Sequence, residues 1–386
     1  MISAAWRADL FCRVVDNLGD AGVCWRLARQ LVQEHGCQVR LVIDDPAALQ
    51  QFVAVDPADM ALLDHGQIVL APWTVTDPAD LVIETFGCDV PAPYAEALAQ
   101  RAPQPVWYNL EYLSAEDWVL GCHGLPSPHP RLPVSRQFFF PGFVNGTGGL
   151  LREAGLLQAV AASQAASAAD LCRATLTADR QARMPPEDLQ VALFCYAHPV
   201  LDQLLAAIEA GPCGVHCRVF QGPAQQQVQA WAAAHPGHRT RFTWLPWLGQ
   251  AAFDQVLWDS DLNLVRGEDS FVRAQWAAKP FFWDIYPQSD DAHLVKMAAF
   301  LRLYRADLPD LAAAQALGAL WQAWVRREGA ALAVAWAAVC RHLPALQAKA
   351  SAWQAQLGQQ PDLLTQLLTD AVGRGLSGPG LAHPPR

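Results

Sequence analysis

The feature that most constrains this chain is an alternation of short apolar runs with segments of helical periodicity, found in two series. The first series has its apolar runs at residues 10–15, 39–43, 67–70, 81–85 and 106–112. The second has them at residues 191–196, 215–220, 241–245, 262–265 and 281–285. Strands that alternate with helices form parallel sheets covered by helices on both faces. The predicted fold class is α/β, with two Rossmann-like domains whose parallel sheets face each other across a cleft.

An alanine-rich span lies between the two series. We expect residues 1–150 to form the N-terminal Rossmann-like domain and residues 188–343 the C-terminal one, joined by a helical connection over 151–187. Residues 344–374 are expected to form helices that pack back on the N-terminal domain. The end of the chain, 375–386, is rich in Gly and Pro and is expected to be a flexible tail.

Charge and cysteine usage limit the partners and the compartment. A net charge of −10 argues against a general binder of nucleic acid or membrane surfaces. The ten cysteines form no CxxC pair and have mostly apolar neighbours, which favours reduced thiols and a cytoplasmic protein. The start of the chain lacks the apolar core of a signal peptide, and no run reaches transmembrane length. Cys213, His216 and Cys217 lack a second ligand pair, so no metal site is predicted.

A strand–glycine–helix junction lies in the second series. The run 262–265 is followed by Arg266, Gly267 and an acidic helix start at Glu268 and Asp269. Free N–H groups and the positive end of a helix dipole make a phosphate site, to which Arg266 adds charge and Ser270 a hydroxyl. The two carboxylates suit ribose or sugar hydroxyls. We interpret the junction as a nucleotide-sugar site; the alternative is an ordinary capped helix of an α/β domain.

Two aspartates follow the first predicted strand, at the sheet edge where ligands of such folds gather. Asp16 and Asp20 lie four residues apart on a glycine-containing loop, before a helix expected from about Gly22 to His35. One carboxylate can act as a base while the other orients a cationic or hydroxyl substrate. The alternative is that Asp16 caps the helix and Asp20 is a solvated turn residue. Gly19 and Gly22 supply only part of a dinucleotide fingerprint, which disfavours an oxidoreductase.

Two further stretches bear on function. Residues 108–118 end a predicted strand in polar and aromatic side chains, a surface that can hold a peptide or protein loop; the alternative is a well-packed aromatic strand end. Residues 259–261 have the Asp-x-Asp form that metal-dependent glycosyltransferases use on a diphosphate. They precede a predicted strand, away from the expected ligand edge, and we interpret them as a turn.

Several segments together resemble one family, the bacterial elongation factor P arginine rhamnosyltransferases, or EarP family. The resemblance covers most of the chain, in the expected order. The matching segments are residues 16–27, 109–116, 139–143, 266–276 and 279–286.

The resemblance implies a GT-B fold and an inverting transfer of L-rhamnose from dTDP-β-L-rhamnose to an arginine of elongation factor P, without a metal. It makes Asp16 and Asp20 the catalytic carboxylates. The donor site it implies is lined by Phe194, Tyr196, Gln250, Arg266, Glu268, Asp269 and Ser270. We assign acceptor binding to Asn17, Glu111 and Tyr112. On this basis 1–150 is the acceptor-binding domain and 188–343 the nucleotide-sugar-binding domain.

The chemistry agrees with this resemblance. A guanidinium is protonated at neutral pH and its lone pairs are delocalised, so two carboxylates are suited to grip it and to accept a proton. We assign Asp20 as the base and Asp16 as its orienting partner. Three other functions stay open: a GT-B glycosyltransferase with a small-molecule or glycan acceptor, a nucleotide-binding oxidoreductase, and a non-catalytic binding protein for a translation factor. The last would not need the aspartate pair.

Overall fold

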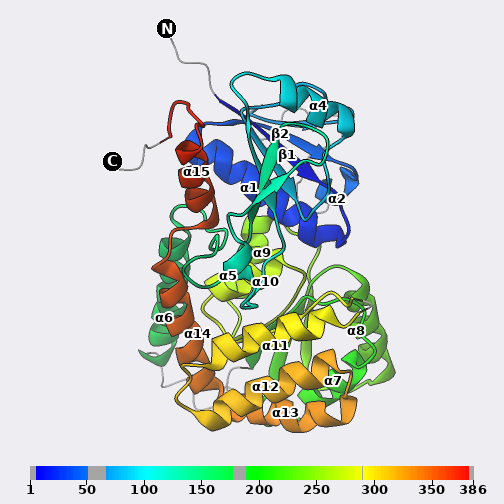
Figure 1. Ribbon diagram of the computed structural model, residues 1–386. Helices are drawn as coiled ribbons and strands as arrows, with labels where there is room; N and C mark the ends of the chain where they lie inside the picture. Colours follow the sequence, from blue (N-terminus) through cyan, green and yellow to red (C-terminus); the bar gives the residue numbers. More distant parts are fainter. Residues whose placement is uncertain (1–5, 51–66, 177–187, 289, 382–386) are drawn as a thin grey trace. The chain divides into compact units, whose positions relative to one another are not determined.

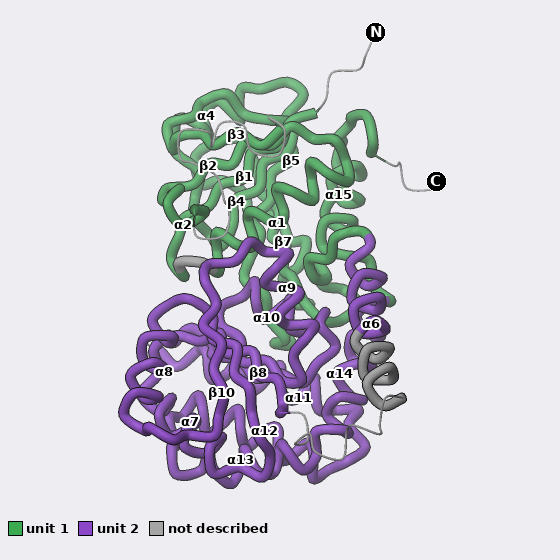
Figure 2. Tube along the Cα trace, turned by 180° about the vertical axis from the view of Figure 1, so that it is seen from behind, with its two compact units in different colours: residues 1–154, 359–386 green, residues 155–358 purple. Residues whose placement is uncertain are grey.

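The chain forms two compact units, each built on one parallel-dominated sheet (Figures 1 and 2). The computed structural model describes residues 6–50, 67–176, 188–288 and 290–381, without the side chains of residues 17, 18 and 167–176. Unit 1 is Met1–Ala154 together with Gln359–Arg386, and unit 2 is Gly155–Gly358. Two segments far apart in the sequence therefore make up unit 1.

Unit 1 holds a seven-stranded sheet in the order β3-β2-β1-β4-β5-β7-β6. Its strands are β1 (Arg7–Cys12), β2 (Gln38–Ile43), β3 (Ile68–Ala71), β4 (Leu81–Thr85), β5 (Val106–Leu110), β6 (Pro126–Pro128) and β7 (Ser135–Phe139). All neighbouring pairs are parallel except β6 with β7. Its helices are α1 (Asn17–His35), α2 (Ala47–Gln50), α4 (Ala92–Gln100), α5 (Val119–Cys122) and α15 (Leu363–Gly373).

The strand order of unit 1 reverses beside β1. From β1 the chain moves outward through β2 and β3, and then returns to place β4 on the other side of β1. Ligands of open α/β sheets bind outside the carboxyl ends of the strands at such a reversal. The segments after Cys12 of β1 and after Thr85 of β4 therefore occupy the expected ligand position of this unit.

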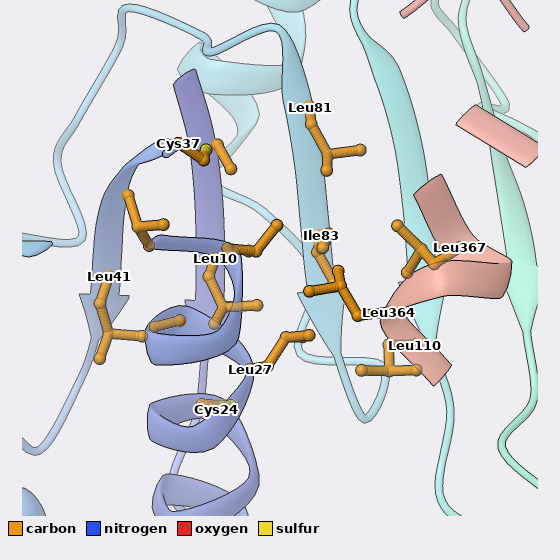
Figure 3. Close-up of a cluster of buried hydrophobic side chains, with 14 of the residues drawn as sticks. Leu10, Cys24, Leu27, Cys37, Leu41, Leu81, Ile83, Leu110, Leu364 and Leu367 are labelled. Carbon is orange, nitrogen blue, oxygen red and sulfur yellow. The ribbon is translucent and has the colours of Figure 1, made fainter. Parts of the chain in front are cut away.

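The core of unit 1 has a part on each face of the sheet. On one face, α1 and α15 pack their apolar side chains against β1, β4 and β5. Figure 3 shows Leu364 and Leu367 of α15 beside Ile83 of β4 and Leu110 of β5. All four are buried, and fully burying one such side chain contributes about 1.5–3 kcal/mol. The C-terminal helix thus stabilises the sheet that the N-terminal segment builds. The opposite face carries a smaller cluster that includes Tyr94 of α4.

Unit 2 holds a five-stranded parallel sheet in the order β10-β9-β8-β11-β12. Its strands are β8 (Leu189–Leu193), β9 (Val215–Val219), β10 (Arg241–Trp244), β11 (Leu262–Arg266) and β12 (Phe281–Asp284). Its helices are α6 (Leu156–Leu176), α7 (Leu201–Glu209), α8 (Pro223–Ala234), α9 (Gln250–Trp258), α10 (Asp269–Trp276), α11 (Ala292–Arg305), α12 (Leu311–Val325), α13 (Gly329–Arg341) and α14 (Leu343–Gly358). The strand order reverses between β8 and β11, so the ligand position of this unit lies after Leu193 and Arg266.

The α/β fold with parallel sheets is confirmed, but several predicted boundaries were wrong. The helix predicted from about Gly22 begins at Asn17, so most of the segment interpreted as a loop is the first turn of α1. The strand predicted over 10–15 is Arg7–Cys12, and the one over 191–196 ends at Leu193. Gly36, with φ of 61°, ends α1 as predicted, because its left-handed conformation suits a residue without a side chain.

We find no single helix among the described residues that is long and apolar enough to cross a membrane. One bent pair, Gly329–Arg341 with Leu343–Gly373, meets the length and composition requirement when its two parts are taken together.

Candidate active site

The predicted aspartate pair lies at the β1–β4 reversal of unit 1. Asp16 is the residue before α1, and Asp20 is in the first turn of that helix. Asp20 is almost completely buried, and its Oδ2 atom accepts the backbone N–H groups of Val15 at 2.9 Å and Asp16 at 2.8 Å. A side chain in the first turn that reaches back to the preceding N–H groups stabilises a helix start. This contact explains why α1 begins ahead of its apolar periodicity.

Burial raises the pKa of the Asp20 carboxyl above its ordinary value, because the charged form loses hydration. Hydrogen bonds from the backbone N–H groups of Asp16 and Val15 oppose this rise in pKa, as does Tyr112, and the charge of Asp44 adds to it. The pKa stays raised in the balance. A carboxylate with a raised pKa binds a proton more readily than an exposed one, which suits a general base.

Asp16 is held in a different environment from Asp20. It is half-buried, and its side chain makes no capping hydrogen bond to the helix. Its carboxylate lies back over the first turn, where Oδ2 would be 2.6 Å from a Cβ atom at Gly19. A side chain at position 19 would therefore displace this carboxylate. Gly19 keeps the space in which the Asp16 carboxylate lies, a role that a dinucleotide fingerprint does not assign to it.

The end of β5 brings two predicted acceptor-binding residues toward the same edge. Tyr112 favours the charged form of the Asp20 carboxyl and so acts to lower its pKa. Glu111 is half-buried, and its Oε1 accepts the side-chain amide of Asn109 at 2.7 Å. Both residues therefore follow β5 at the carboxyl edge of the sheet, the edge at which the aspartate pair follows β1. The side chain of Asn17, the third residue predicted to bind the acceptor, lies outside the described part of the chain.

Arg266 ends β11 at the reversal of unit 2. Its guanidinium carbon lies 4.5 Å from the ring centre of Phe194 and 4.8 Å from that of Tyr196. Its Nη1 atom donates to the carbonyl oxygen of Cys195 at 3.4 Å, and the residue is buried. Cation–π contacts of this kind hold the planar guanidinium in one orientation. Three of the predicted donor-binding residues therefore form one cluster.

The junction between β11 and α10 is braced from within. Gly267 has φ of 60°, and its carbonyl accepts the indole N–H of Trp283 at 2.8 Å. The buried Ser270 hydroxyl accepts the backbone N–H of Arg266 at 3.0 Å and donates to the carbonyl of the same residue. Ser270 thus closes the turn between β11 and α10. The sequence analysis expected its hydroxyl to bind phosphate and did not predict this structural role.

The remaining predicted donor residues lie on α9 and α10. Glu268 is the residue before α10 and Asp269 is its first residue, and both are half-buried. Gln250 begins α9 and is buried. A buried ion pair joins the two helices, since Arg273 donates to both oxygens of Asp254 at 2.7 and 3.2 Å. This pair keeps α10 in a fixed relation to α9.

Sequence reasoning missed three residues of these two sites. Asp44, after β2, accepts the N–H of Val14 at 2.9 Å and influences Asp20. Asp284 ends β12 and accepts the backbone N–H of Tyr196, a predicted donor-binding residue, at 2.8 Å. Phe86 follows β4 and contacts Tyr112. Asp44 and Phe86 come directly after predicted strands and Asp284 lies at the end of one, so the carboxyl-end rule could have identified all three.

Both stretches that the sequence analysis considered as metal sites, residues 213–217 and 259–261, belong to unit 2. Within the described ranges, no group of three or more His, Cys, Asp or Glu side chains is placed to hold a metal ion. Asp259 to Asp261 precede β11, at its amino-terminal end, as the turn interpretation predicted. Asp261 accepts the N–H of Gln190 at 2.8 Å, which ties this turn to the neighbouring strand β8.

Comparisons with known proteins agree on one family. Residues 8–371 match the family model described as "Elongation-Factor P (EF-P) rhamnosyltransferase EarP". A protein-arginine rhamnosyltransferase of Pseudomonas putida is 45% identical over 382 residues, covering 95% of this chain and 98% of that protein. One from Pseudomonas aeruginosa is 42% identical over 379 residues, with coverage of 95% and 98%. A solved structure, described as "Structural basis for EarP-mediated arginine glycosylation of translation elongation factor EF-P", is 32% identical, with a TM-score of 0.61 and coverage of 96% and 100%.

Proposed function

The chain belongs to the elongation factor P rhamnosyltransferase (EarP) family, and from that membership we propose its reaction. The chain is a glycosyltransferase that moves a rhamnosyl group to an arginine side chain. The donor is dTDP-β-L-rhamnose, the acceptor is one arginine of translation elongation factor P, and the configuration at the anomeric carbon is inverted. The observation that carries the proposal is the buried, raised-pKa carboxylate of Asp20 beside Asp16 at the ligand position of unit 1.

On the acceptor side, the mechanism must activate an arginine guanidinium, which is a poor nucleophile. The guanidinium is cationic at neutral pH, so Asp16 and Asp20 bind it as a pair of opposite charges. One guanidinium nitrogen attacks the anomeric carbon and forms the C–N bond. The nitrogen then carries an extra proton, which passes to the Asp20 carboxylate. The raised pKa of Asp20 favours this transfer. Asp16 holds the remaining positive charge in place and orients the attacking nitrogen.

The donor half needs stabilisation of the leaving diphosphate. The C–O bond between the anomeric carbon and the diphosphate breaks as the C–N bond forms, and its electron pair stays on dTDP. Arg266 supplies a fixed positive charge, and the N–H groups at the start of α10, with the positive end of its helix dipole, face the same way. Glu268 and Asp269 lie at that helix start, where their carboxylates can accept hydrogen bonds from sugar and ribose hydroxyls.

Mass spectrometry tests the proposed reaction. Purified elongation factor P is incubated with this protein and dTDP-β-L-rhamnose, and its intact mass is measured. The expected result is one deoxyhexosyl addition that maps to one arginine, and NMR of the modified peptide should show inverted configuration. An elongation factor P variant with lysine at that arginine is the matched control and should stay unmodified. No addition, or an equal addition from other nucleotide sugars, would reject the proposal in favour of a different acceptor or donor.

A further inference from the structure

The hydrogen-bond ladder between β8 and β11 stops before it reaches Tyr196. Phe194, one residue beyond β8, still donates its N–H to the carbonyl of Leu264 at 2.9 Å. In a parallel ladder the next bond would join the N–H of Tyr196 to the carbonyl of Arg266, two residues further along each strand. The Ser270 hydroxyl donates to that carbonyl instead, at the point where the chain turns into α10. The N–H of Tyr196 therefore bonds to a different acceptor.

Asp284 supplies this acceptor from the far side of β11. It ends β12, which lies on the other side of β11 from β8, and its Cα partner across the β11–β12 pair is Arg266. Its Oδ2 atom accepts the N–H of Tyr196 at 2.8 Å. The bond thus joins the segments that follow the two neighbours of β11, at the level of its last residue.

The Asp284 carboxylate is itself held by α12. Asp284 is only 4% exposed, and its Oδ1 atom accepts the indole N–H of Trp324 at 3.0 Å. The Trp324 ring is completely buried and stacks on the His198 ring, with centres 3.9 Å apart and an interplanar angle of 16°. His198 lies in the loop after β8, two residues beyond Tyr196. One buried side chain of α12 therefore contacts both the carboxylate and the loop that the carboxylate binds.

The loop after β8 in turn holds Arg266. The rings of Phe194 and Tyr196 face its guanidinium, and the carbonyl of Cys195 accepts its Nη1 atom. A group that fixes the backbone at Tyr196 therefore fixes one of the rings that orient the guanidinium. Hydrogen bonds to a carboxylate are about twice as strong as those to a neutral acceptor. Asp284 thus restrains this loop more firmly than a ladder carbonyl would.

We propose that Asp284 is a positioning residue for the sugar donor: its buried carboxylate, fixed by the Trp324 indole, keeps the loop after β8 closed on Arg266. The inference rests on the proposed function, because it takes Arg266 as the cation that binds the diphosphate. Asp284 acts through the backbone of Tyr196 and does not contact the donor. Its loss should weaken donor binding and leave the acceptor site unchanged, since the residues proposed to bind the acceptor belong to unit 1.

The first experiment compares two tryptophans of α12 that donate to the same strand. Trp324→Phe removes the indole N–H that reaches Asp284 and keeps a ring for stacking on His198. Trp321→Phe is the matched control, because Trp321 is also completely buried and donates its indole N–H to the carbonyl of Phe281, at the start of β12, at 3.0 Å. Both variants should lower the urea midpoint of unfolding. Only Trp324→Phe should weaken dTDP binding in calorimetry, by about 3- to 10-fold.

Asp284→Asn tests the carboxylate itself. Asparagine has one carbonyl oxygen and one NH₂ group, so it can accept only one of the two N–H groups and presents a donor to the other. We expect the Kd for dTDP to rise about 10-fold or more, with an unchanged KM for elongation factor P. Hydrogen exchange at the Tyr196 amide, followed by NMR in the free protein, should be faster in Asp284→Asn and unchanged in Trp321→Phe.

A double-mutant cycle identifies the route by which Asp284 acts. Lysine at position 266 is a point charge that does not lie as a plane against the two rings. In the Arg266→Lys background, Asp284→Asn should therefore weaken dTDP binding by much less than it does in the wild type. Full multiplication of the two effects would show that Asp284 acts by a route other than Arg266, and would overturn the inference.

Three further results would contradict the proposed role. Wild-type dTDP affinity in Asp284→Asn would remove Asp284 from the donor site. Equal weakening of dTDP binding in Trp324→Phe and Trp321→Phe would show that a general loss of stability is the cause. Unchanged exchange at Tyr196 in Asp284→Asn would show that the carboxylate does not hold the loop. Failure of the wild-type protein to bind dTDP would reject the proposed donor instead, and the exchange measurement would still decide whether Asp284 holds the loop.

Discussion

The Oδ2 atom of Asp20 lies 2.8 Å from the backbone nitrogen of Asp16 and accepts its N–H. The Asp20 side chain therefore fixes the backbone that carries Asp16. An asparagine at position 20 keeps a carbonyl oxygen that can accept the same N–H, while it loses the charge and the basicity. The substitution Asp20→Asn thus separates the chemical role of this carboxylate from its structural role.

The first prediction is that the acid limb of the pH–rate profile reflects Asp20. The base must be ionised to accept a proton, and burial raises its pKa. Activity should therefore fall, with decreasing pH, at a pH above the ordinary range of an aspartate. The acceptor guanidinium does not titrate in this range. The measurement is kcat/KM against pH in the wild type. Constant kcat/KM down to pH 4, with the protein still folded, would contradict the assignment.

The second prediction concerns donor affinity. Arg266→Lys replaces a planar cation that lies against two aromatic rings with a point charge that cannot stack in the same way. We expect dTDP binding, measured by calorimetry, to weaken about 10-fold or more. Arg241→Lys, at an exposed arginine of β10, is the control and should bind dTDP normally. Unchanged affinity in Arg266→Lys would place the nucleotide away from this junction.

The third prediction is that Ser270→Ala affects stability as well as binding. The Ser270 hydroxyl bonds to both the N–H and the carbonyl of Arg266, so its loss opens the turn between β11 and α10. We expect the free energy of unfolding to fall by about 1–2 kcal/mol. Donor affinity should weaken several-fold because Arg266 is less well held. Chemical denaturation and calorimetry check the two effects; weaker binding with unchanged stability would indicate a direct bond to the donor instead.

The fourth prediction is that Glu84 makes the protein less stable as the pH rises. Burial raises the pKa of Glu84 to about 7, against an opposing effect of Arg136. The unfolded chain releases this proton near the ordinary value of 4.5, so folding becomes less favourable between about pH 4.5 and 7. The loss is about 3 kcal/mol, because the pKa rises from 4.5 to about 7 and each pKa unit corresponds to about 1.4 kcal/mol. Unfolding in urea at pH 5 and pH 8 measures it, and Glu84→Gln should abolish this part of the pH dependence. An identical pH dependence in Glu84→Gln would contradict the account.

The sequence predicted the elements better than the contacts. Strand β4 was placed to the residue, because turn residues bound it. The start of α1 was missed, since Asp16 to Gly22 has a loop composition. The Asp20 side chain supplies the acceptor for the N–H groups before that helix, a contact that periodicity does not report.

The candidate site shows the same limit. The place of the aspartate pair followed from the rule that ligands gather at the carboxyl ends of parallel strands. The rule does not show that Asp20 is buried while Asp16 is only half-buried, because burial depends on packing between segments far apart in the sequence. It also does not show that Phe86 has a positive φ, which the contacts of its turn with Leu110 and Asn109 impose.

The fifth prediction is that Asp16 and Asp20 act in turnover and not in donor binding. Asp20→Asn should slow single-turnover transfer by about 10²–10⁴-fold, the usual contribution of a general base. Asp16→Asn should also slow it, with weaker acceptor binding, because one charge facing the guanidinium is lost. Both variants should bind dTDP as the wild type does, since the residues proposed to bind the donor belong to unit 2. Asp80→Asn, just before β4, makes the same chemical change at the opposite edge of the sheet and serves as the control.

The most direct test of the account is the single-turnover rate of Asp20→Asn with saturating donor and elongation factor P, measured together with its thermal melt. The account predicts a folded protein with normal donor affinity and a rate lowered by about 10²–10⁴-fold. A wild-type rate would contradict it, would remove Asp20 from the mechanism, and would direct the search for the base to Glu111 or Glu268.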